Sequence, residues 1–260
     1  MTTESIVLIG RERSDAGELF ETHAGRLADR SGVDTVETAT YETEPVQELR
    51  EQLRGLSADR VYAVPMRIAH NHDTTRGVPA ALSHISGEVV YCEPPGASDA
   101  VTDVIEQKAS SLVTPRPESS LVLVGFGSNS QPDHRETAEQ HAARLRDRTE
   151  YGEVVSCYLL QNPAVECVRY NVSNPAVVAV PLFLGESEAT AERIPEQLEL
   201  GRGGIEYAGP LGSHPRITDA IHAEIEKQRA LDESAPEPFE AELARTRQPV
   251  ATDGDGSSRS

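Results

Sequence analysis

The sequence predicts an α/β protein with two tandem-duplicated halves, each a parallel sheet with helices on both faces, and a cleft between the halves. Its 260 residues are enough for two modest domains with their own cores. Short apolar runs alternate with amphipathic segments, and the whole series occurs twice. Such alternation is typical of parallel sheets that helices cover on both faces.

The duplication is visible as blocks that recur about 115 residues later. Residues 5–10 (SIVLIG) recur as 120–125 (SLVLVG), and residues 61–65 (VYAVP) recur as 177–181 (VVAVP). A third block, EPPG at 93, recurs as GPLG at 209. Because several independent blocks match at nearly the same spacing, they indicate an internal repeat.

The first half opens with an apolar run, Ile6 to Ile9, that is too short for a helix and rich in β-branched residues. This pattern predicts a buried parallel strand. The elements expected after it are a helix over 15–30, a strand over 34–41, a helix over 46–56, a strand over 61–66, a helix over 74–84, a strand over 88–93 and a helix over 98–110. The second half should repeat this order and end near Ala230.

These patterns divide the chain into four parts. Residues 1–113 form the first half, 114–118 (TPRPE) a linker, and 119–230 the second half. Residues 231–260 form an acidic, polar tail, which we expect to be disordered because it offers little apolar surface to offset the entropy of ordering.

The formal net charge of −19 argues against nucleic acid or an anionic membrane as a partner, because both require a basic surface. Nearly all basic residues are arginine, and the lysines are Lys108 and Lys227. An acidic, lysine-poor chain favours a salt-adapted cytoplasm over an ordinary acidic protein, which would explain the charge but not the shortage of lysine.

The chain has no apolar run long enough for a membrane span and no signal-peptide pattern, so we expect a cytoplasmic location. Its cysteines are Cys92, Cys157 and Cys167. Their odd number and the lack of CxxC spacing indicate neither a disulfide framework nor a zinc site, and all three are expected to be buried.

Candidate site residues follow the strands, because ligands bind beyond the carboxyl ends of parallel strands. After the third strand come His70 and His72, which would project to one side of an extended segment and could share a metal ion, with Asp73 as a third ligand or as a partner that orients a ring. The alternative is a polar loop with two solvated histidines. The corresponding residues of the second half are Glu186 and Glu188, which are either ligands for a hard metal or acidic surface.

Arginines gather near the same strand ends: Arg11, Arg13, Arg67 and Arg76. In so acidic a chain this clustering favours a polycarboxylate ligand bound by bidentate pairing, although surface arginines that pair with acidic neighbours would give the same pattern. The turn after the fifth strand, 125–130 (GFGSNS), could hold an anion on its backbone N–H groups and Ser128, or could be only a tight turn. Of the histidines on expected helices, His134 lies near enough to this turn to be a reserve candidate.

The repeated sequence blocks of the two halves resemble those of the sirohydrochlorin cobaltochelatase and ferrochelatase family, the class II tetrapyrrole chelatases. The resemblance rests on VLIG at 7 and VLVGFGS at 122, each a strand that ends in a Gly turn. It also rests on VPLFL at 180 with Ile194-Pro195, on their counterparts VPM at 64 and Val78-Pro79, and on the two Pro-x-Gly blocks. It implies a lyase that inserts Co²⁺, or otherwise Fe²⁺ or Ni²⁺, into sirohydrochlorin without ATP in cobalamin or tetrapyrrole biosynthesis. No cofactor beyond the substrate metal is implied, and two halves could supply a complete cleft in a monomer.

The chain departs from the family's site pattern. The family's turn histidine is replaced by Arg11 and Phe126, and its loop histidine falls on Asp73 and Ala189, with His72 one position early. The resemblance therefore implies only a loop site: His70 and His72 as metal ligands and His72 or Asp73 as the base.

The substrate carboxylates would then be held by Arg11, Arg67, Arg76 and Ser128. One alternative is a non-catalytic paralogue that binds the tetrapyrrole or the metal, which the loss of both turn histidines favours. Another is a scaffold that keeps only the fold.

Overall fold

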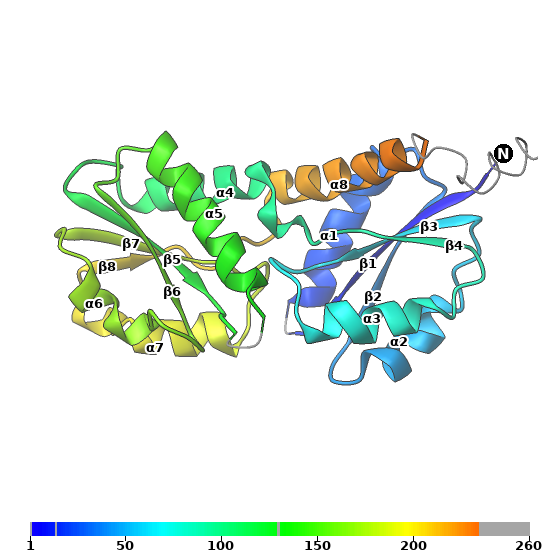
Figure 1. The fold of residues 1–260 in the computed structure, drawn as a ribbon, viewed down its shortest axis with the longest axis horizontal. Helices are drawn as coiled ribbons and strands as arrows, with labels where there is room; N and C mark the ends of the chain where they lie inside the picture. Colours follow the sequence, from blue (N-terminus) through cyan, green and yellow to red (C-terminus); the bar gives the residue numbers. More distant parts are fainter. Residues whose placement is uncertain (1, 14, 129–130, 234–260) are drawn as a thin grey trace, which may run out of the picture.

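Each half of the chain forms a four-stranded parallel sheet in the computed structural model, which describes residues 2–13, 15–128 and 131–233 (Figure 1). The first sheet has the order β2-β1-β3-β4 and the second the order β6-β5-β7-β8. Their strands are β1 (Glu4–Arg11), β2 (Thr35–Tyr41), β3 (Arg60–Pro65), β4 (Glu88–Tyr91), β5 (Ser119–Gly125), β6 (Glu153–Tyr158), β7 (Ala176–Pro181) and β8 (Ile205–Tyr207).

The two sheets repeat each other in register. Ile9 of β1 lies opposite Pro65 of β3, and Val124 of β5 lies opposite Pro181 of β7. All residues of β5 are buried, as expected for a central parallel strand that is covered on both faces.

Helices cover both faces of each sheet. The α-helices are α1 (Ala16–Ala28), α2 (Pro45–Leu53), α3 (Val78–Leu82), α4 (Asp99–Leu112), α5 (Asp133–Arg148), α6 (Val168–Asn171), α7 (Ile194–Gln197) and α8 (Pro215–Glu233). Short 3₁₀ helices lie at η2 (Pro95–Ala97), η3 (Val165–Cys167) and η5 (Leu200–Arg202), and π-helices at η1 (Asp73–Gly77) and η4 (Ala189–Arg193). Helices α2 and α3 pack on one face of the first sheet, and α6 and α7 on the equivalent face of the second.

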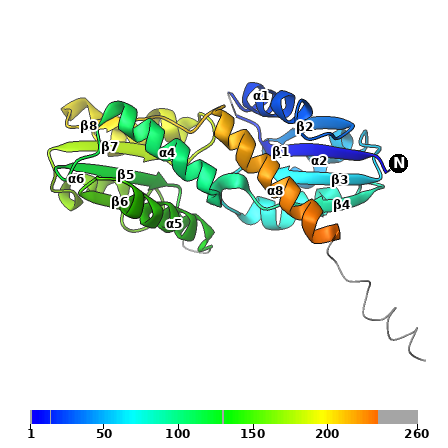
Figure 2. The same ribbon diagram turned by 90° about the horizontal axis from the view of Figure 1, so that it is seen from above.

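The halves exchange their last helices (Figure 2). Helix α4, from the first half, lies against α5 and β7 of the second, while α8 lies against α1 of the first. Two buried hydrogen bonds of 2.8 Å join these elements: His141 Nδ1 of α5 to Thr102 Oγ1 of α4, and His23 Nδ1 of α1 to Thr218 Oγ1 of α8. One hydrophobic core therefore runs through both halves on this side of the molecule.

Arg229 fixes the far end of α8 to the first sheet. Its guanidinium donates to Glu4 Oε2 over 2.7 Å and lies 5.3 Å from the centre of the Tyr62 ring. The beginning and the end of the described chain are thus in direct contact.

The predicted α/β fold of two parallel-sheet halves is confirmed, with its elements in the expected order. The helix expected over 74–84 begins as the π-helix η1 and ends at Leu82, and α8 continues to Glu233, past the expected end near Ala230. The rest of the tail that was expected to be disordered, 234–260, lies outside the described residues. No helix within the described ranges is long and apolar enough to cross a bilayer.

The prediction that all three cysteines are buried is wrong for one of them. Cys92 and Cys157 are buried, whereas Cys167 is exposed. Cys167 ends the 3₁₀ turn η3, a short surface element in the place where the first half has the longer helix α2.

Candidate active site between the two sheets

A cleft of about 170 Å³ lies where the carboxyl ends of the two sheets meet. Residues that follow β1 and β3 form one wall, and residues that follow β5 and β7 form the other. This is the position in which parallel sheets bind ligands, and here two such edges face each other.

Glycines shape both strand ends. A Cβ atom at Gly10 would lie 2.3 Å from the Phe20 ring, so glycine is needed for α1 to pack this closely on β1. In the matching turn of the second half, Gly127 has a φ of +77°, a conformation that residues with a side chain rarely adopt. The Gly motifs therefore serve the geometry of the turns.

The first-half wall combines arginines with apolar side chains, which are Ala16, Leu19, Phe20, Met66 and Ile68. It is called the basic wall below, because the arginines of the cleft come from this half. Arg11, Arg13 and Arg67 line the cleft together with Asn71. Arg11 Nε donates to the carbonyl oxygen of Glu42 over 2.7 Å, which directs its side chain. Burial lowers the pKa of Arg67, and repulsion from Arg13 and Arg11 lowers it further, against the opposing effect of Tyr41 and Asp73. Because these guanidinium groups repel one another, an anion bound between them would be stabilised, so the wall indicates an anionic ligand.

The second-half wall is mostly apolar and is called the aromatic wall below. Its apolar side chains are Phe126, Leu182, Phe183 and Leu184, and Gly185 and Ser187 also line it. The Phe126 and Phe183 rings meet edge to face, with centroids 6.3 Å apart. Such a surface suits the flat face of an aromatic ligand.

His134, in the first turn of α5, also lines the cleft. Its ring centroid is 6.1 Å from that of Phe126. Burial and the nearby Arg67 cation lower its pKa to about 4, although Asp133 acts in the opposite direction. The imidazole is therefore neutral at pH 7 and has a lone pair to offer. From the sequence, His134 is only a reserve candidate, and the single feature that indicates it is its proximity in sequence to the Gly125 turn.

Asp15 connects the two walls. Its Oδ2 accepts a hydrogen bond of 2.9 Å from the backbone N–H of Glu186, in the second half. Its Oδ1 is buried and has no hydrogen-bond partner among the described residues. One oxygen of this carboxylate, which lines the cleft, thus has unused hydrogen-bonding capacity.

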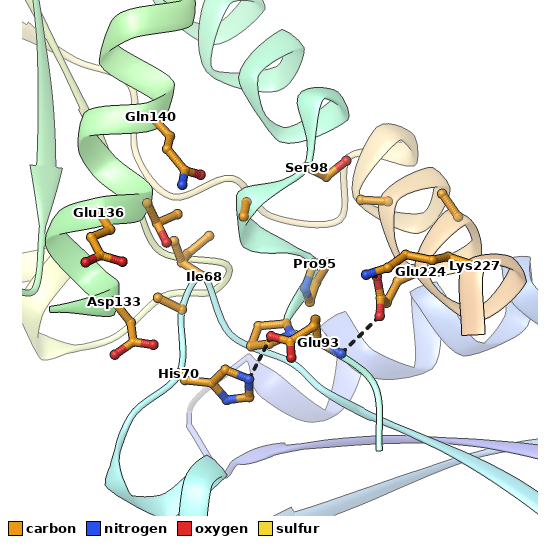
Figure 3. A pocket seen from close by; sticks show the side chains of 16 residues that line it. Ile68, His70, Glu93, Pro95, Ser98, Asp133, Glu136, Gln140, Glu224 and Lys227 are labelled. Atoms are coloured by element: carbon orange, nitrogen blue, oxygen red, sulfur yellow. Dashed lines mark hydrogen bonds and ion pairs between the residues drawn. The ribbon is translucent and has the colours of Figure 1, made fainter. Parts of the chain in front are cut away.

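His70 does not lie in this cleft. Its Nδ1 is 3.1 Å from Thr74 Oγ1 and its Nε2 is 3.0 Å from Glu93 Oε2. It lines a separate cavity of about 430 Å³ between the loop after β3, the loop after β4, α5 and α8, where Glu224 accepts a hydrogen bond from the Glu93 backbone (Figure 3).

The loop residues His72 and Asp73 are also apart from the cleft lining. The segment was expected to be extended, but His72 has helical dihedrals and is exposed at the start of η1, so the two histidines do not project together into one site. Asp73 Oδ2 accepts from the Tyr41 hydroxyl at 3.4 Å. Within the described ranges, no group of three or more His, Cys, Asp or Glu side chains could hold a metal ion.

Of the four residues expected to bind substrate, the structure places Arg11 and Arg67 at the cleft. Arg76 is exposed on η1. Ser128 belongs to the turn, where its N–H donates to Gln161 Oε1 and its Oγ accepts from the N–H of Gln131. Glu186 and Glu188 of the second half are exposed.

A protein-family model described as CbiX matches residues 5–112 and again 120–228. The chain belongs to the CbiX family. Each half of this CbiX protein matches the model separately, in agreement with the internal repeat. A curated relative from Halobacterium salinarum, "Probable sirohydrochlorin cobaltochelatase", is 28% identical over 299 residues that cover 97% of this chain and 100% of the relative.

Two solved structures share the fold of the CbiX protein. SirB from Bacillus subtilis with Fe³⁺ has a TM-score of 0.73 at 18% identity, over 89% of this chain and 97% of SirB. A multi-domain protein from Deinococcus radiodurans with structural similarity to chelatases has a TM-score of 0.70 at 22% identity. That match covers 86% of this chain but only 55% of the Deinococcus protein, which has two additional domains.

Proposed function

We propose that this CbiX protein inserts a divalent metal ion into sirohydrochlorin held in the cleft between its halves. The observation that carries the proposal is the pairing of a basic wall with an aromatic wall in one cleft. Sirohydrochlorin is a flat tetrapyrrole that bears eight carboxylates, so it presents both an apolar face and an anionic rim.

The two walls match these two features. Arg11, Arg13 and Arg67 can pair with acetate and propionate groups, because a guanidinium binds a carboxylate through two parallel hydrogen bonds. Phe126 and Phe183 can cover a face of the macrocycle.

The size of the cleft sets a condition on binding. Its volume of about 170 Å³ is below the ~300–1,000 Å³ of pockets that enclose drug-sized ligands. A tetrapyrrole must therefore bind with much of its rim in solvent, or the walls must separate on binding. An exposed rim suits a substrate whose edge carries charged carboxylates.

The metal is a substrate of this reaction, and Co²⁺ is the first choice because the Halobacterium relative is named a cobaltochelatase. Fe²⁺ and Ni²⁺ are the alternatives, since imidazole and pyrrole nitrogens bind all three ions. The proposal also includes an ATP-independent reaction and a cytoplasmic location. It includes a monomer as well, because the two halves complete the cleft within one chain.

The test is metal insertion by the pure protein. Sirohydrochlorin and Co²⁺ are mixed with it at high salt and without ATP, and the absorbance is followed against a control without protein. A rate above the control that falls in Arg67→Ala supports a chelatase that works from the cleft. A wild-type rate equal to the control contradicts it.

A non-catalytic tetrapyrrole-binding protein is the second candidate. It is favoured by Arg11 and Phe126, which stand where the family has its turn histidine. Tight binding of sirohydrochlorin without acceleration of metal insertion would establish this alternative, and neither binding nor insertion would leave only a scaffold.

A further inference from the structure

Among the described residues that line the cleft, His134 is the one imidazole. It belongs to the second half, yet it lies close enough to Arg67 of the first half for that cation to affect its pKa. It therefore stands at the junction of the basic and aromatic walls, where the macrocycle would lie under the proposed function.

The ring is held in place by packing. Phe126 lies beside it at a centroid distance of 6.1 Å, tilted by 52°, and the backbone is fixed in the first turn of α5. No hydrogen bond joins a ring nitrogen of His134 to another residue in the described ranges. By contrast, the buried His23 and His141 each have Nδ1 engaged with a threonine. His134 thus keeps nitrogen lone-pair capacity at the cleft.

From this geometry we infer that His134 presents the metal ion to the macrocycle, an inference that rests on the proposed function. The role falls to a helix residue because neither strand-end turn carries a histidine. A neutral imidazole binds Co²⁺, Fe²⁺ and Ni²⁺ well. The nearby guanidinium groups cannot bind a cation, so the imidazole is the nitrogen ligand that the cleft offers.

A single imidazole suits a metal that must leave. A site with three or four protein ligands would hold the ion against transfer, and no such group exists among the described His, Cys, Asp and Glu residues. With one protein nitrogen and water as its ligands, the ion remains exchangeable. The four pyrrole nitrogens can then outcompete the protein.

The transfer step balances in charge and protons. The bond from the His134 nitrogen to M²⁺ breaks as bonds from the pyrrole nitrogens to M²⁺ form, and two N–H protons leave the macrocycle. Both protons pass to water, because an imidazole whose pKa is lowered to about 4 does not hold a proton at pH 7. No oxidant or reductant is needed, because the metal remains divalent.

The experiment compares His134→Ala and His134→Gln with the wild type and with His84→Ala, a matched control in which an exposed histidine outside the cleft is removed. In both His134 variants the kcat for Co²⁺ insertion should fall about 100-fold, the scale typical of a lost proton- or metal-handling group. The Kd for sirohydrochlorin, measured by absorbance titration, should change less than threefold, and added imidazole should restore part of the rate to His134→Ala.

A second readout is independent of turnover. Substoichiometric Co²⁺ should broaden the ring signals of His134 in NMR spectra before those of His84, with the His134 signals assigned by their loss in His134→Gln. If the wild type inserts metal but the His134 variants keep its rate, the inference is overturned while the proposed function stands. If the wild type shows no insertion, the proposed function fails; selective broadening of His134 then supports only metal binding at the cleft, and its absence overturns the inference.

Discussion

The two walls of the cleft come from equivalent positions of a duplicated half, yet they carry different side chains at two matching positions. Arg11 corresponds to Phe126 in the repeat, and Arg67 corresponds to Phe183. At these two positions the first half supplies positive charge and the second supplies aromatic rings. The two copies of the repeat therefore differ where they line the cleft.

The supporting framework did not diverge in the same way. In the first half the N–H of Asn71 donates to Thr74 Oγ1 over 2.8 Å, and in the second the N–H of Ser187 donates to Thr190 Oγ1 over 2.9 Å. Each threonine carbonyl in turn accepts from a tyrosine hydroxyl, at 2.7 Å and 2.9 Å. Both loops then enter a π-helix, η1 or η4, a rare element that is frequent at functional sites. The comparison separates residues that hold the loops from residues that face the ligand.

The largest expected effect concerns features that the halves share. Burial lowers the pKa of both His23 and His141 from 6.5 to about 4. Between pH 6.5 and pH 4 the unfolded chain takes up protons that the folded chain excludes, so stability should fall as the pH decreases through this window and level off below it. Each histidine can contribute up to about 3 kcal/mol.

Chemical denaturation at several pH values measures this loss. In His141→Gln the dependence of unfolding free energy on pH between 6.5 and 4 should be shallower than in the wild type, and His23→Gln should behave alike. An unchanged slope in both variants would contradict the expectation and would assign acid sensitivity to the carboxylates.

The second expected effect concerns the basic wall. Replacing Arg67 by alanine removes a half-buried cation, and the affinity for sirohydrochlorin should fall about 100-fold, or about 2.7 kcal/mol, as for a lost charged hydrogen bond. Absorbance titration of the macrocycle measures the change. Arg50→Ala, which removes an exposed arginine from α2, is the control and should bind like the wild type.

The aromatic wall should give a smaller effect. Phe126→Ala removes apolar surface and one ring of an edge-to-face pair, so sirohydrochlorin should bind about tenfold more weakly. Because the lost interaction is apolar, this change should persist at high salt, whereas the effect of Arg67→Ala should shrink. Titrations at low and high salt measure both, and equal salt dependence would show that the walls do not divide the ligand as proposed.

The smallest effect is expected in the loop after β3. His70 and His72 lie outside the cleft lining, so the double variant His70→Ala, His72→Ala should keep the rate of metal insertion within about threefold. The variant loses the contacts of His70 to Thr74 and Glu93, which hold the loop and not the cleft. Steady-state kinetics with Co²⁺ provide the measurement. A 100-fold loss of the insertion rate in the double variant would contradict this expectation and would indicate that the metal binds at this loop.

The sequence was sufficient for the repeat and for most elements, because apolar runs such as Ile6 to Ile9 and the blocks at equal spacing determine them locally. It also located Arg11 and Arg67, since both directly follow strands that end at the cleft. The conformation of 70–73 could not be read in the same way, because hydrogen bonds around Thr74 turn that loop into a helix.

His134 was harder to place. It is one of eight histidines in the chain and lies on a helix of the second half. Its relation to the cleft depends on how two distant strand ends face each other. The exchange of α4 and α8 was equally invisible, because a repeat in sequence does not state which copy of the sheet an amphipathic helix will cover.

That exchange has a consequence for the order in which the chain can fold. The first sheet receives one of its covering helices only from residues 215–233, and Arg229 contacts Glu4 across a separation of 225 residues. During synthesis, the apolar face of the first sheet must therefore wait for nearly the whole chain, and contacts of such high sequence separation slow folding. Neither copy can therefore complete its core from its own half of the chain.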